Sequence, residues 1–245
     1  VVAADLRGYG DSSRPPSGEN HAGYSFRAMA ADQRALMNEL GHERYAVVGH
    51  DRGARVAHRL GLDAPETVTR LALLDILPTA HVYDSVDRRL ATAYYHWFFF
   101  IQRAPVPERL IAGDPVGYLH SLLGGWGSGL DAYDPGALKE YERCFLDADA
   151  RHAMLEDYRA GASVDYDLDT ADAAAGRMLE APTLLLWGSR SVVGRSPTSP
   201  VDVWRTRAVD VTGQPVDAGH FLAEERPAET LAALQEFLGE GPGLR

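Results

Sequence analysis

The chain has 245 residues, with 35 acidic against 24 basic side chains and a formal net charge of −11. This length allows one substantial hydrophobic core, or a core with a lid. The negative charge would repel nucleic acid and anionic membrane, so we expect neither as a partner. The single cysteine, Cys144, excludes an internal disulfide framework. No secretion pattern or bilayer-length apolar run is present, so we expect a cytoplasmic protein.

The chain opens on an apolar segment. Residues 1–4 are predicted to form a buried strand, followed by a Gly/Ser/Pro loop through Gly23. Ser25 is a good N-cap for a helix that runs to about Leu40 and is stopped by Gly41. Because the chain lacks an initiator Met and begins on a strand that looks central, we expect an N-terminal part to be missing.

Strand-like and helix-like segments then alternate. The segments "RYAVVGHD", "RLALLDILPT", "APTLLLWGS" and "VTGQPVDAGH" are predicted core segments of a sheet, and "PAETLAALQEFLG" is a closing helix. This alternation indicates an α/β fold, with a mostly parallel sheet flanked by helices on both faces. The intervening segment is aromatic and helix-patterned. We therefore predict an α/β core of residues 1–78 and 180–245, with an inserted helical cap of residues 79–179.

The segment "VVGHDRGARV" joins a predicted strand to a predicted helix. Gly49 and Gly53 flank Asp51 with the spacing of a nucleophile elbow, a sharp turn that exposes its central side chain above the sheet. A carboxylate at this position can attack carbon and leave a covalent ester. The alternative is that Asp51 only caps the helix that follows it.

Two further residues favour catalysis over capping. Asp75 ends the strand "LALLD", and His220 follows the last strand in "DAGHF". In a parallel sheet both residues fall at the carboxyl edge with Asp51, where ligands bind. The order nucleophile, acid, histidine is that of hydrolases with this elbow. Asp217 is a second candidate for the acid, although we expect its side chain to point elsewhere.

These motifs resemble one family closely. The segments "DLRGYGDSSRP", "VVGHDRGARVAHRLGLDAPETVTRLALLDILPT", "YYHWFFF", "EDYRAGASVDY" and "DAGHFLAEERP" are similar to the haloacetate dehalogenases of the α/β-hydrolase fold. The resemblance implies that fluoroacetate or chloroacetate is converted to glycolate and halide, with Asp51 as nucleophile. It implies that His220 is the base that activates water and that Asp75 is the acid that orients His220. It also implies a homodimer and no cofactor.

Two arginines follow the nucleophile. Arg52 and Arg55 are three residues apart, so both guanidinium groups lie on one face of the first helical turn. Two such forks can grip a carboxylate, which a small anionic haloacid supplies. The alternative is an exposed helix start whose arginines form surface ion pairs.

The predicted cap carries side chains that can donate hydrogen bonds. By the resemblance, His96, Trp97 and Tyr158 form the halide pocket, and Trp126 is a pocket wall that limits substrate size. The alternative for all four is ordinary aromatic packing within the cap. No metal-binding cluster is predicted.

Two other functions remain open at this point. An epoxide hydrolase would use the same Asp51, His220 and Asp75, with Tyr158 and either Tyr94 or Tyr95 donating to the epoxide oxygen. A catalytically impaired fragment, or a binding module that keeps the pocket, is the third reading. The family's first strands and its His-Gly loop, which supplies a second backbone donor above the nucleophile, would precede Val1. Losing one such donor costs about 100- to 1000-fold in rate.

Overall fold

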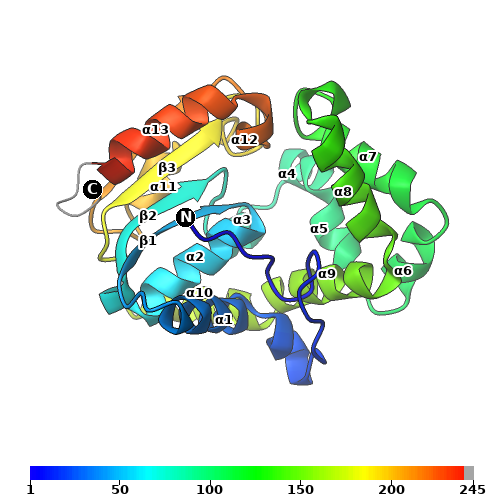
Figure 1. Ribbon diagram of the computed structural model, residues 1–245, viewed down its shortest axis with the longest axis horizontal. Helices are drawn as coiled ribbons and strands as arrows, with labels where there is room; N and C mark the ends of the chain where they lie inside the picture. The colour runs from blue at the N-terminus through cyan, green and yellow to red at the C-terminus, as the bar shows by residue number, and fades with distance from the viewer. Residues whose placement is uncertain (240–245) are drawn as a thin grey trace.

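The computed structural model describes residues 1–239 and contains a four-stranded parallel sheet in the order β1-β2-β3-β4 (Figure 1). The strands are Tyr45–His50 (β1), Val68–Leu74 (β2), Thr183–Gly188 (β3) and Val211–Val216 (β4). All four were expected from apolar segments, so the prediction of an α/β fold with a parallel sheet is confirmed.

Thirteen α-helices and three short 3₁₀-helices lie within residues 1–239. The α-helices are Phe26–Glu39 (α1), Arg52–Asp63 (α2), Thr79–Asp84 (α3), Arg88–Ala93 (α4), Tyr95–Phe100 (α5), Val106–Ile111 (α6), Pro115–Gly125 (α7), Pro135–Leu146 (α8), Ala148–Gly161 (α9), Val164–Ala174 (α10), Pro200–Trp204 (α11), Leu222–Glu225 (α12) and Pro227–Gly239 (α13). The 3₁₀-helices are Glu19–Tyr24, Pro65–Thr67 and Leu130–Ala132. No helix in this part of the chain is both long and apolar enough to cross a membrane.

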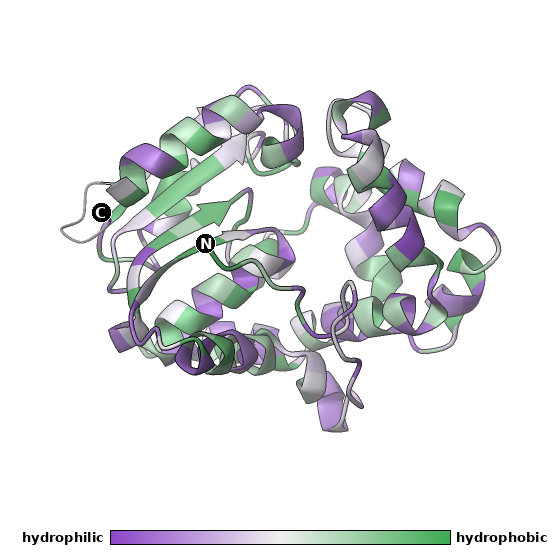
Figure 2. Cartoon of the chain, in the orientation of Figure 1, coloured by the Kyte–Doolittle hydropathy of each residue, from purple (hydrophilic) through white to green (hydrophobic). Residues whose placement is uncertain are grey.

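The two faces of the sheet pack against different helices. On β2, Leu71 and Leu73 belong to the larger core with α1 and α2, whereas Ala72 and Leu74 pack toward α13. This alternation is the period-2 geometry of a strand, and apolar residues on both faces explain why β2 and most of β3 are green in Figure 2.

The start of the chain differs from the prediction. Residues 1–4 are exposed and form no strand. A strand needs a partner for its backbone N–H and C=O groups, and within residues 1–239 β1 pairs only with β2. The predicted helix is confirmed, because Ser25 Oγ accepts from the Ala28 N–H and Gly41 follows the helix end with φ +82°.

The segment predicted as a cap is helical throughout. In Figure 1, helices α4–α8 form a lobe beside the carboxyl edge of the sheet, and α9 runs below them toward α10. Helices α3 and α10, near the two ends of the segment, pack against each other. The segment therefore leaves the sheet after β2 and returns to it before β3, which places the lobe directly above the carboxyl ends of both strands.

Candidate active site

Asp51 occupies the turn between β1 and α2. Its φ of +47° lies in a region that non-glycine residues rarely adopt, and its side chain makes no capping hydrogen bond to α2. Capping therefore does not explain this residue. A Cβ on Gly49 would lie 2.5 Å from the Gly53 carbonyl oxygen, so this turn requires glycine there. Gly53 is not required in the same way, because a Cβ at that position would meet no atom within 4 Å.

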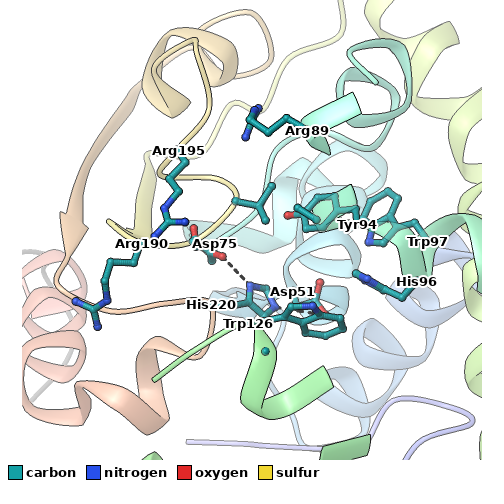
Figure 3. A pocket seen from close by; sticks show the side chains of 14 residues that line it. Asp51, Asp75, Arg89, Tyr94, His96, Trp97, Trp126, Arg190, Arg195 and His220 are labelled. Atoms are coloured by element: carbon teal, nitrogen blue, oxygen red, sulfur yellow. Dashed lines mark hydrogen bonds and ion pairs between the residues drawn. The ribbon is translucent and has the colours of Figure 1, made fainter. Parts of the chain in front are cut away.

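His220 lies between two carboxylates. Its Nδ1 is 2.6 Å from Asp75 Oδ2, and its Nε2 is 3.8 Å from Asp51 Oδ2 (Figure 3). A proton on Nδ1 that is held by Asp75 leaves Nε2 directed toward Asp51. The three residues that the sequence placed at the carboxyl edge of the sheet therefore lie together, with His220 between Asp51 and Asp75.

Asp75 is fixed by further donors that the sequence analysis did not find. The Ser191 hydroxyl donates to Asp75 Oδ1 at 2.6 Å, and the Gly188 amide donates to the same oxygen at 3.0 Å. Gly188 ends β3 and Ser191 follows it, so both donors lie at the same edge of the sheet, which is the one signal that could have indicated them. Asp217, the other candidate acid, has a side chain that is 75% exposed and pairs with Arg190.

The two carboxylates change the ionisation of His220. Burial alone lowers the pKa of His220, but the negative charges of Asp51 and Asp75 and the hydrogen bond to Asp75 outweigh it and raise the pKa well above its ordinary value of 6.5. Burial raises the pKa of Asp51, while His220, His50 and Arg52 together lower it far below its ordinary value. Asp51 is therefore ionised at neutral pH, as a nucleophile must be.

Two cavities meet at Asp51. The first, of about 290 Å³, is bordered by Asp51, Asp75 and His220 together with His96 and Trp97. The second, of about 500 Å³, is bordered by Asp51, Arg52, Tyr9 and Tyr158 and by many apolar side chains of the cap segment. Trp126 also lines both cavities, so it borders each of them close to Asp51.

The two arginines are buried, at 7% exposure for Arg52 and 3% for Arg55, so the alternative of an exposed helix start does not hold. Arg52 forms an ion pair with the fully buried Asp157. Its Nε donates at 2.7 Å and its Nη2 at 2.5 Å to the Asp157 carboxylate, which also accepts from the Tyr9 hydroxyl at 2.6 Å. Asp157 explains how a cation is tolerated at a helix N-terminus.

Arg55 has a different environment. Its Nη1 donates to the Leu77 carbonyl and to Thr79 Oγ1, and its Nε is buried with no hydrogen-bond partner among the described residues. Its guanidinium lies 4.6 Å from the centre of the Trp97 ring. Arg55 lines neither cavity, so it lies behind Trp97 rather than on the surface of the site.

The aromatic residues of the predicted halide pocket form one cluster. The His96 ring centre lies 4.2 Å from that of Trp126 and 5.9 Å from that of Tyr158. Burial lowers the pKa of His96 to about 3, so its imidazole is neutral and keeps one N–H donor. Burial raises the pKa of Tyr158 well above 10, so its hydroxyl stays protonated. His96 and Tyr158 can therefore both donate hydrogen bonds while they carry no charge.

Asp157 and Tyr9 were not predicted from the sequence. Both form the polar network around Arg52, and Asp157 stands next to Tyr158 in a segment that the analysis did use. Within residues 1–239 no group of three or more His, Cys, Asp or Glu side chains is arranged to hold a metal ion.

Comparison with known proteins agrees with this geometry. A model of the α/β-hydrolase fold family matches residues 1–227. A fluoroacetate dehalogenase from Burkholderia sp is 45% identical over 241 residues, which cover 98% of this chain and 78% of that protein. A soluble epoxide hydrolase from Corynebacterium sp. (strain C12) is 30% identical over 97% of this chain and 80% of its own length.

A solved structure gives the same result in three dimensions. The crystal structure of a protein described as an α/β hydrolase from Nostoc sp PCC 7120 superposes with a TM-score of 0.95 and 51% identity. It covers 98% of this chain, which in turn covers 82% of that protein. From the family match, these identities and the shared architecture, we conclude that the chain belongs to the α/β-hydrolase fold family.

Proposed function

We propose that this protein is a hydrolytic dehalogenase of short 2-haloacids, which converts fluoroacetate or chloroacetate to glycolate and halide. The observation that carries the proposal is Asp51 on a strained elbow beside two buried arginines, with His220 directed at it from Asp75. The 45% identity to a fluoroacetate dehalogenase over nearly the whole chain supports the same reaction.

In the first step, an Asp51 oxygen attacks the α-carbon of the haloacid from the side opposite the halogen. A carbon–oxygen bond forms as the carbon–halogen bond breaks, and the halide leaves with the electron pair. His96, Trp97 and Tyr158 would donate hydrogen bonds to the departing halide. Because these three hydrogen-bond donors are uncharged, they would stabilise the negative charge of the halide but bind it less strongly than a cation would.

In the second step, water hydrolyses the ester on Asp51. Formation of the ester removes the negative charge of Asp51, and this loss lowers the pKa of His220 toward its ordinary value. Neutral imidazole can then accept a proton from water while Asp75 holds it in place. The hydroxide attacks the Asp51 carbonyl carbon, and glycolate leaves as the Asp51 carboxylate is restored.

Arg52, which lines the second cavity, would bind the carboxylate of the substrate directly, and Arg55, which lies behind Trp97, would attract it by its charge. Three N–H bonds of Arg52 are already used by Asp157, which leaves the two on Nη1 for a ligand. Arg55 has no carboxylate partner, and its buried Nε has an unused donor. Burial and the neighbouring charge of Arg52 lower the pKa of Arg55, so an anion between them would relieve this repulsion.

The direct experiment measures halide and glycolate release from fluoroacetate and chloroacetate, for the wild type and for Asp51→Asn. Release of both products by the wild type, and its loss in the variant, is the expected result. His220→Gln should stop the reaction at the ester, which mass spectrometry of the intact protein detects as one added carboxymethyl group on Asp51. If the wild type releases no halide from either acid, the proposal is wrong.

Epoxide hydrolysis is the second candidate. The hydroxyl of Tyr158 borders the cavity at Asp51, and Tyr94 lines the other cavity beside His96. These phenols could donate to an epoxide oxygen, and an epoxide hydrolase is 30% identical to the chain. Diol formation from styrene oxide without halide release from haloacids would favour this function over the first.

A further inference from the structure

Charge is distributed unevenly around the first cavity. The chain carries 35 acidic and 24 basic residues. Among the described residues that line this cavity, however, the charged groups beyond Asp51, Asp75 and His220 are three arginines, Arg89, Arg190 and Arg195. A cluster of three cations on the wall of one cavity, in a protein of the opposite net charge, needs a local explanation.

The arginines reach the cavity from opposite sides. Arg89 belongs to α4 in the cap segment, whereas Arg190 and Arg195 belong to the loop that follows β3 (Figure 3). Arg190 is occupied, because it pairs with Asp217 and lies 3.6 Å from Glu225. Arg89 and Arg195 are exposed and form no ion pair within residues 1–239.

This cavity also contains two of the three side chains that would hold the halide. His96 and Trp97 line it together with Asp51, while Arg52 and Tyr158 line the other cavity. An anion released beside His96 therefore lies in a cavity whose walls carry unpaired positive charge. An anion that moves from His96 and Trp97 toward solvent would therefore be attracted by the exposed Arg89 and Arg195.

We propose that Arg89 and Arg195 form a binding site for small monovalent anions at the opening of this cavity, through which the halide product leaves. The inference rests on the proposed function for the identity of the anion. Cationic side chains clustered at the exposed side of a cleft raise the local concentration of anions by about tenfold or more. The site would attract the halide away from the His96 and Trp97 donors before it reaches solvent.

The test measures bromide binding to the wild-type protein by quenching of tryptophan fluorescence, with sodium gluconate added to keep ionic strength constant. Trp97 and Trp126 border the cavity and report on an ion inside it. Arg89→Gln/Arg195→Gln should weaken bromide binding about tenfold. The matched control is Arg88→Gln/Arg103→Gln, which removes the same charge from exposed arginines that border no described cavity. It should bind bromide as the wild type does.

A lysine pair separates charge from packing, because Arg89→Lys/Arg195→Lys keeps both charges and should keep the affinity. Acetate as a second probe identifies the source of the anion. Equal weakening for acetate means that carboxylate substrates also use the site, whereas unchanged acetate binding assigns it to halide alone. Equal bromide binding by the two glutamine pairs, or none by the wild type, would overturn the inference. Failure of the proposed function would instead appear as absent halide release with this binding intact.

Discussion

The sheet edge and the cap contribute to the site by different physical means. At the sheet edge, Asp75 and His220 are fixed by short hydrogen bonds from Ser191, Gly188 and each other. On the cap side, His96 and Trp126 are positioned mainly by ring packing at 4.2 Å between centres. Hydrogen bonds set direction sharply, while ring packing sets shape, so the edge would determine the chemistry and the cap the choice of substrate.

The largest expected effect comes from the edge. Asp75→Asn removes the acceptor that holds the His220 Nδ1 proton and allows the wrong tautomer, so kcat for haloacid hydrolysis should fall about 10⁴-fold. Halide release under saturating substrate measures this, with Asp217→Asn as the matched control at an exposed carboxylate. A similar loss in the control would place the acid at Asp217 instead.

The contact between edge and cap is tested at Asp157. Asp157→Asn leaves the Arg52 guanidinium buried without its carboxylate, which should lower the free energy of unfolding by about 3–5 kcal/mol. Chemical denaturation measures the change. If stability is unchanged, the pair is not the main link between α2 and α9. In the folded variant, Arg52 is free to turn, so KM for the haloacid should change more than kcat.

A smaller effect is expected in the cap. Tyr158→Phe keeps the ring that lies 4.2 Å from the Arg52 guanidinium but removes the hydroxyl. Loss of one donor to the departing halide should lower kcat about 100-fold. The loss should be greater for fluoroacetate than for chloroacetate, because fluoride depends more on hydrogen bonds. Equal losses for the two acids would show that the hydroxyl does not contact the halogen.

The smallest expected effect is a change in titration. Because Asp51 and Asp75 raise the pKa of His220 above 6.5, Asp51→Asn should lower this pKa toward 6.5. NMR of the imidazole protons measures both values. The raised pKa of His220 also contributes to the free energy of unfolding. This contribution is full below about pH 6.5 and is lost as pH rises through the folded-state pKa. An unchanged pKa in the variant would mean that Asp51 does not interact with His220.

Local pattern was sufficient for much of the fold. The four strands, the helix capped by Ser25 and the helical segment after β2 are set by apolar periodicity and end signals, which act over a few residues. The strand expected at residues 1–4 was wrong for a related reason. Its apolar sequence is suited to a strand, but a strand forms only with a partner, and that is a tertiary condition.

The sequence by itself determined which residues meet at the carboxyl edge, because parallel strands bring their ends together whatever their spacing along the chain. It placed Asp51, Asp75 and His220 correctly on this ground. Only the tertiary structure decided the state of the arginines. Arg52 and Arg55 look equivalent three residues apart, but Asp157 lies 105 residues from Arg52, and no local pattern announces such a pair. Burial and long-range charge depend on which segments pack together, so they are decided only once the chain has folded.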